Sequence, residues 1–107
     1  MPEKDKNYEE RLTYFQNEMR DENPGTRWKA IEALARMGDE RVVDPIIFAL
    51  SDEDWRVRQK AAWALGFLGD PRAILPLRHA LRDELEGVKE MITEALDKIN
   101  RKMAESG

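Results

Sequence analysis

The sequence predicts an all-α fold, a short α-solenoid of about six helices whose helix pairs repeat every 31 residues, forming a single domain over residues 1–107. Residues 21–51 align with residues 52–82 without a gap, and 13 of the 31 positions are identical. A fixed period of about 20 to 50 residues is typical of solenoids, in which each unit buries its apolar face against a neighbour. Apolar residues recur at helical spacing and no segment sustains a period of two, so we predict no strands.

The first helix is predicted over residues 6–20. Its apolar residues stand 31 positions before those of a later second helix, with Leu12, Phe15 and Met19 preceding Val43, Ile46 and Leu50. Residues 8–20 are therefore expected to form a second-half helix without its first half and to serve as an N-terminal capping half-repeat. The polar outer face that a terminal repeat needs is supplied by Glu9, Glu10, Gln16, Asn17 and Glu18.

Each full repeat opens with an amphipathic first helix, predicted over residues 25–37 and 54–67. In the second copy the apolar stripe consists of Val57, Ala61, Ala64, Leu65 and Leu68. Gly69 follows this stripe, at the position where a helix commonly ends on a residue in the left-handed conformation. The first helix of the second repeat should therefore end just before Gly69.

A second helix completes each repeat and is predicted over residues 40–50 and 71–82. Asp70 is expected to cap the later one, with Pro71 at its first position, where a missing N–H costs nothing. Pro45 and Pro76 fall inside these helices, where a proline removes a backbone hydrogen bond. We therefore expect a kink or an imperfect first turn at each of these prolines.

The last helix is predicted over residues 86–103, within a third copy that starts at Asp83. Four of its residues match the second repeat in the 31-residue alignment: Val88, Lys89, Ala95 and Leu96 align with Val57, Arg58, Ala64 and Leu65. After these positions the third copy no longer resembles the other two. Residues 83–103 are accordingly expected to form a C-terminal capping helix after the full repeats 21–51 and 52–82.

A family pattern is present in both repeats, as TRWKAIEALARMGDERVVDPIIFAL in the first and VRQKAAWALGFLGDPRAILPLRHAL in the second. Its elements are Val-Arg, Ala-Ala, Ala-Leu-Gly, Gly-Asp and Pro-Leu. The pattern resembles the short HEAT-like repeat called the phycobilisome-lyase repeat, over about 80 residues. The resemblance implies an α-solenoid with first helices on one face and second helices on the other. Tetratricopeptide and ankyrin repeats fit less well, because their periods are longer and their signatures are absent.

The residue content argues against an enzyme. The chain has no cysteine, so thiolate nucleophiles and thiolate metal sites are excluded. His79 is its single histidine, which rules out a site with two or three histidine ligands and the His-Glu pairs that hold iron in HEAT-like hydroxylases. No acid–base set converges in the sequence. We expect no catalysis, no cofactor and no metal, with His79 as a surface or packing residue.

Charge and hydropathy restrict the location and the partners. A formal net charge of −4 is not the footprint of a nucleic-acid binder. No stretch approaches the roughly 20 apolar residues that a membrane span needs, and the first residues contain no apolar signal segment. Because cysteine is absent as well, we expect a cytoplasmic protein that binds neither membrane nor, by preference, nucleic acid.

Several charged residues recur in register with the repeat, namely Arg27, Arg58 and Lys89, and also Asp39 and Asp70. Residues that recur once per unit usually serve the repeat itself. We expect them to form helix caps and an inter-repeat ladder of Asp–Arg hydrogen bonds.

Large aromatic residues stand beside the core stripe of the first helices. Trp63 and Phe67 lie one turn apart, at positions that the family pattern usually leaves polar, and Trp55 lies two turns earlier. Trp28, in the preceding first helix, aligns with Gln59 and should lie beside it. An apolar patch on a small domain usually marks a contact surface. The alternative is that the central helix is buried on all sides and that these aromatic residues belong to the core.

We predict that this aromatic and basic face binds a protein or peptide, or a second copy of the chain. The predicted contact residues are Trp28, Lys29, Trp55, Arg56, Gln59, Lys60, Trp63 and Phe67. Basic residues, including Arg36, flank the tryptophans, whereas acidic residues, Glu86, Glu90 and Glu94, follow the last helix, so a partner of mixed charge fits best. The alternative is that these charged residues only form ordinary solvated faces of their helices.

A second reading is a lyase-accessory or nucleic-acid-binding HEAT-like protein. Related DNA glycosylases hold DNA with Trp, Asp and Arg on a concave face, and Trp28, Trp63 and Arg56 offer comparable side chains. No catalytic Asp can be placed beside them, and the net charge opposes this reading.

Overall fold

A computed structural model describes residues 2–106, and the side chains of residues 6–82 and 84–106. This part of the chain forms six α-helices and four short 3-10 turns and contains no strand. The α-helices are α1 (Pro2–Glu18), α2 (Pro24–Met37), α3 (Val43–Phe48), α4 (Trp55–Leu68), α5 (Ile74–Ala80) and α6 (Glu86–Ser106). The predicted all-α class with about six helices is confirmed.

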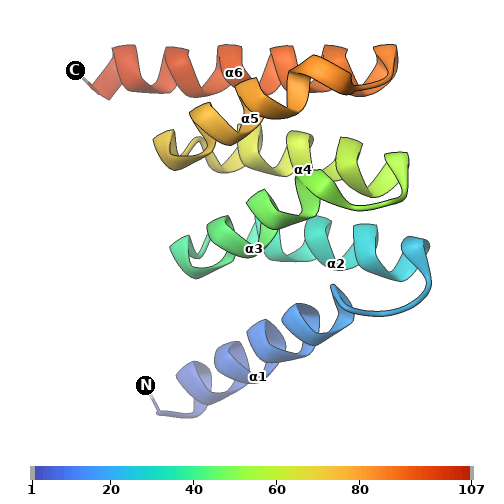
Figure 1. Ribbon diagram of the computed structural model, residues 1–107. Coiled ribbons are helices and arrows are strands. Elements are labelled where there is room, and N and C mark those ends of the chain that lie inside the picture. The colour runs from blue at the N-terminus through green and yellow to red at the C-terminus, as the bar shows by residue number, and fades with distance from the viewer. Residues whose placement is uncertain (1, 107) are drawn as a thin grey trace.

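The helices form two layers (Figure 1). The first helices α2, α4 and α6 pack side by side, with α4 in the middle, and α3 and α5 lie against this row. Helix α1 packs on α2, and its Tyr8 hydroxyl donates a 2.9 Å hydrogen bond to Asp39, at the start of the next second helix. The Cα atoms span 43 × 39 × 15 Å, so the molecule is a flat slab with two broad faces.

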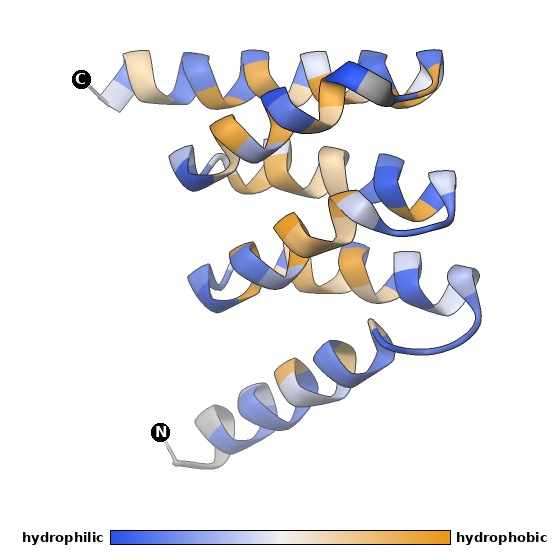
Figure 2. Ribbon diagram, in the orientation of Figure 1, coloured by the Kyte–Doolittle hydropathy of each residue, from blue (hydrophilic) through white to orange (hydrophobic). Residues whose placement is uncertain are grey.

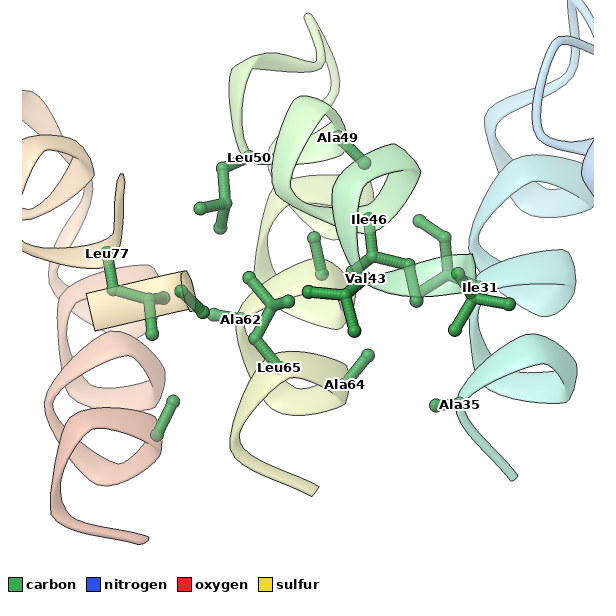
Figure 3. Packing of buried hydrophobic residues seen from close by; sticks show 14 of the residues in the cluster. Ile31, Ala35, Val43, Ile46, Ala49, Leu50, Ala62, Ala64, Leu65 and Leu77 are labelled. Atoms are coloured by element: carbon green, nitrogen blue, oxygen red, sulfur yellow. The ribbon is translucent and has the colours of Figure 1, made fainter. Parts of the chain in front are cut away.

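The core lies between the two layers. Leu65 of α4 is fully buried and lies between Leu77 of α5 and Val43 of α3 (Figure 3). Colouring by hydropathy shows the apolar positions concentrated where helices meet, whereas α1 is mostly hydrophilic (Figure 2). No polar or charged residue is buried among those whose side chains are described, so the core is held together by apolar burial alone.

The first helices begin at side-chain caps that were not predicted, and they end before glycines. Asn23 and Asp54 cap their starts, with side-chain oxygens that accept N–H hydrogen bonds at 2.7 and 2.8 Å. Gly38 and Gly69 follow their last residues with φ values of 68° and 70°, in the left-handed region that glycine adopts without steric cost. The predicted end of α4 before Gly69 is confirmed.

The second helices lie where they are predicted, over about residues 40–50 and 71–82, but only the middle of each is α-helical. Each begins and ends as a 3-10 turn, with Glu40–Val42 and Ala49–Ser51 around α3, and Pro71–Ala73 and Leu81–Asp83 around α5. Pro45 and Pro76 occupy the third position of each α-helical segment, where an N–H has no partner within that segment. The imperfect first turn expected at these prolines is therefore present.

Asp70 caps the start of the later second helix, with Pro71 after it, as predicted, and Asp39 caps the earlier one in the same way. Each carboxylate accepts from the N–H two residues later and from the guanidinium of Arg41 or Arg72, and it does not bond to the arginines of the ladder. These hydrogen bonds hold the pKa of both carboxyl groups below the usual range of aspartate.

A ladder is formed nonetheless, with acceptors in the loops between repeats. The Arg27 guanidinium donates two 2.9 Å hydrogen bonds to the Asp52 carboxylate. One repeat later, Arg58 donates to Glu84 at 2.6 Å and to the Asp52 carbonyl at 2.8 Å. These side chains are largely shielded from water, so the bidentate pairs fix where each first helix begins relative to the next.

Helices α4 and α6 approach each other more closely than side chains normally allow. A Cβ atom added to Gly66 would lie 2.8 Å from the Cα atom of Ala95. Only glycine permits this approach in the middle of α4, despite its low helix propensity.

Candidate interaction surface

The aromatic residues predicted on the first helices form a compact cluster across α2 and α4, which are neighbours in Figure 1. Trp63 and Phe67 lie one turn apart on α4, with ring centroids 5.3 Å apart and planes 24° from parallel. Trp28 joins them from α2 through a lysine that both indoles contact. We call Trp28, Lys60, Trp63 and Phe67 the aromatic cluster.

Lys60 holds the aromatic cluster together. Its ammonium nitrogen lies 5.1 Å from the ring centroid of Trp28 and 4.9 Å from that of Trp63. The same nitrogen donates to a carboxylate oxygen of Glu32 at 3.2 Å. A cation placed over the faces of two indoles is attracted by both rings, so Lys60 links α2 to α4 by charge as well as by contact.

Arg36 extends this arrangement along α2. Its guanidinium lies 5.7 Å from the Trp63 ring centroid and donates to Glu32 at 3.2 Å. Glu32 thus accepts hydrogen bonds from two cations. Both bonds lower the pKa of its carboxyl group, and the bond from Lys60 has the larger effect. The cluster is consequently a cationic–aromatic surface with one carboxylate at its centre.

The members of the aromatic cluster differ in exposure. Phe67 is 50% exposed, whereas Trp28 and Trp63 are half-buried and pack against the hydrophobic core. The outer edge of the cluster is therefore a half-exposed aromatic ring that stacks on Trp63, whose indole packs against the core.

The remaining predicted residues lie around the cluster rather than in it. Trp55 is 46% exposed at the start of α4, and no ring contact joins it to the cluster among the residues that the structure describes. Arg56 turns toward Asp54, and this hydrogen bond lowers the pKa of Asp54 to about 2. Gln59 donates to the Gly87 carbonyl of α6 at 3.3 Å, while Lys29 is exposed on α2.

The opposite flank of the first-helix layer is acidic, since α6 exposes Glu86, Glu90 and Glu94. Lys98 approaches Glu94 at 4.0 Å one turn later. The first-helix face thus runs from basic residues on α2 and α4 to acidic residues on the first half of α6.

Two exposed apolar residues on the other face escaped the sequence reasoning. Phe48 of α3 is 83% exposed and Leu75 of α5 is 72% exposed. In the 31-residue register Phe48 corresponds to His79 and Leu75 to Asp44, so each apolar residue has a polar counterpart. Trp63 and Phe67 were predicted from a departure from the family pattern, whereas a comparison of the two repeats with each other would have found Phe48 and Leu75.

His79 is exposed, and no group of three His, Asp or Glu side chains that could hold a metal ion lies within the described residues. Across residues 2–106, each helix is too short or too polar to cross a bilayer.

The family is settled by sequence comparison. The sequence pattern of HEAT repeats matches residues 13–97, from the last half of α1 into α6. Among curated proteins, none matches this chain in sequence. The matched span contains the paired helices and the two layers described above, and this match extends over most of the chain. The chain therefore belongs to the HEAT repeat family.

Proposed function

We propose that this protein is a non-catalytic interaction module or scaffold that binds a protein or peptide through the cationic–aromatic face of α2 and α4. HEAT repeats are commonly protein-interaction modules and generally serve as scaffolds without catalysis. The observation that carries the proposal is Phe67, which is half exposed although its ring is stacked on Trp63. An exposed ring supported in this way is ready to act as an anchor.

The face is organised before any partner arrives. Lys60 is fixed between two indoles and a carboxylate, so the aromatic side chains lose little further freedom on binding. A large aromatic residue can bury about 150–250 Å². The slab face extends over 43 × 39 Å, which exceeds the roughly 800 Å² per partner of a standard interface.

The charges favour a protein over a nucleic acid. Lys60 and Arg36 share Glu32, and Arg56 is paired with Asp54, so these cations already have carboxylate partners. A phosphate backbone would have to compete for each of them. The exposed Glu86, Glu90 and Glu94 of α6 would repel phosphates but would attract basic residues of a polypeptide that spans the face.

The proposed organisation is two full repeats, 21–51 and 52–82, between the capping segments 8–20 and 83–103. Leu12 is buried while most of the remaining surface of α1 is polar, as the end of a solenoid requires. We place the protein in the cytoplasm, which its cysteine-free composition favours. The repeats are proposed to be of the phycobilisome-lyase type, on the motif resemblance alone.

The proposal is tested by quantitative capture from lysate of the source cells on three immobilised proteins, the wild type and the Phe67→Ser and Phe48→Ser variants. A partner of the first-helix face should be retained by the wild type and by Phe48→Ser and lost with Phe67→Ser. Sedimentation of the free protein at two widely separated concentrations shows whether that partner is a second copy. Equal retention on all three proteins, with a monomer at both concentrations, would refute the proposed site.

A further inference from the structure

The second-helix face carries an apolar site that is separate from the aromatic cluster. Phe48 and Leu75, at 83% and 72%, are the two most exposed large apolar residues in the described part of the chain. Both line a hollow of about 590 Å³ between α3 and α5. Exposing two such residues together costs solvation free energy that a purely structural position would avoid.

The lining of the hollow is mostly apolar and comes from both second helices. Ile47 and Leu50 line it from the α3 side, and Pro76 and Ala80 line it from α5. Phe48 also borders a second hollow, of about 750 Å³, that α1 and α3 line together. The Phe48 ring thus lies between the two hollows, so a bound peptide can contact it from either one.

The repeat register shows that this exposure is not a requirement of the fold. The counterpart of Phe48 is His79 and that of Leu75 is Asp44, and both counterparts are exposed polar residues in the same structure. Each apolar residue therefore stands where the neighbouring repeat folds equally well with a polar one. The two repeats differ here in such a way that their apolar residues meet in one hollow.

The exposed charge beside this hollow, on α5 and the turn that follows it, is basic; of these residues His79 lines the hollow itself. Among the described side chains of residues 74–84, the exposed ionisable ones are Arg78, His79 and Arg82. Glu84 does not offset them, because it is 8% exposed and bonded to Arg58 at 2.6 Å. On α3, Asp44 lines the second hollow and not this one, and it lies 3.7 Å from Arg72, whose own charge it partly balances.

We propose that the hollow between α3 and α5 binds an acidic amphipathic helix of a partner protein, through Phe48 and Leu75, with Arg78 and Arg82 contacting its carboxylates. Apolar residues one turn apart on such a helix would enter the hollow on either side of Phe48, as in helix-in-groove recognition. Acidic residues beside them would face α5, where the charge is complementary. This site is independent of the cationic–aromatic face, which lies on the other layer.

The test is a selection from a displayed library of helical peptides of about 16 residues, roughly four turns, with randomised surface positions. The wild-type protein is the bait, and the Phe48→Ser/Leu75→Ser variant serves for counter-selection. We expect the selected peptides to be enriched in Glu and Asp and to carry apolar residues three or four positions apart. Circular dichroism of each variant establishes that the helices are retained.

Fluorescence anisotropy of a labelled selected peptide then locates the site. Binding should weaken about tenfold or more for Phe48→Ser/Leu75→Ser and for Arg78→Glu/Arg82→Glu, and stay within about twofold for Phe67→Ser on the opposite face. Failure to enrich any peptide over the double variant would overturn the proposal, as would selection of basic peptides or loss of binding with Phe67→Ser. A wild-type dimer that Phe48→Ser dissociates would show instead that a second copy occupies the hollow.

Discussion

Lys60 illustrates how single residues connect the surface of this protein to its stability. Its ammonium group contacts Trp28, Trp63 and Glu32, and so it joins two helices at the rim of the core. In the first repeat its counterpart is Lys29, which is exposed. The same residue type at equivalent positions thus has two different environments, because only the second repeat has an aromatic residue, Trp63, one turn away.

This difference predicts unequal effects of removing the two charges. Lys60→Met should lower the free energy of unfolding by about 1 kcal/mol, because each partly exposed cation–π contact contributes about 0.5–1 kcal/mol and methionine recovers some packing. Lys29→Met, the matched control, should stay within about 0.5 kcal/mol of the wild type. Urea unfolding measures both, and equal losses would contradict the role given to Lys60.

A second residue-level prediction concerns the contact of α4 with α6. Gly66→Ala should destabilise the protein by about 1–3 kcal/mol, because its Cβ would lie 2.8 Å from Ala95 Cα, which belongs to the backbone of α6 and cannot move alone. Gly87→Ala is the matched control, since its added Cβ would meet only the Gln59 side chain at 3.7 Å. The control should be neutral or slightly stabilising. Thermal unfolding of both variants decides the matter, and a harmless Gly66→Ala would disprove the close approach.

Helix α4 lies between α2 and α6, and its two sides pack against these neighbours in different ways. Toward α6 it presents Gly66, which lets the helices approach closely, and toward α2 it presents Lys60 and Trp63. The second helices depend more on their caps, since α3 and α5 are short and each follows a 3-10 turn that an aspartate begins. Such short segments gain little from helix propensity, so capping and burial must stabilise them.

The caps predict a loss of stability in acid. Hydrogen bonds to arginine and to backbone N–H groups lower the pKa of Asp39, Asp54 and Asp70 in the folded protein, that of Asp54 to about 2. An unfolded aspartate titrates near pH 3.9, so as the pH falls the unfolded chain takes up protons first. The stabilisation is therefore complete above about pH 4 to 5 and is lost as the pH falls toward 2.

The melting temperature followed by circular dichroism between pH 7 and pH 2 checks this expectation. It should change little down to about pH 5 and then fall, and the fall should be shallower in Asp54→Asn, which has no carboxylate to protonate. A melting temperature that stays level between pH 4 and pH 2 would contradict the assignment of these caps.

For the whole molecule, the 31-residue repeat predicted the class and the helix order, because solenoid units stack only on their neighbours. The two layers were implied by the resemblance to the HEAT-like repeat. Arg27 and Arg58 form the expected ladder, but repeat register alone does not show that the folded layers bring the loop carboxylates of Asp52 and Glu84 to them. The prolines predicted irregular second helices, but the 3-10 geometry at their starts was not predicted, because the same Asp cap can begin either an α-helix or a 3-10 turn. Spacing alone placed Trp63 beside Phe67, whereas the position of Lys60 between two indoles needed both helices in place.

The central claim is that the outer edge of the aromatic cluster is a contact surface and not part of the core. The most direct measurement is the free energy of unfolding of Phe67→Ser in urea. Because half of the Phe67 side chain lies in solvent above Trp63, we predict a loss of no more than about 1 kcal/mol, with helicity unchanged. A loss of about 3–5 kcal/mol, as expected for emptying a core aromatic position, would show that Phe67 is structural and would contradict the proposed interaction face.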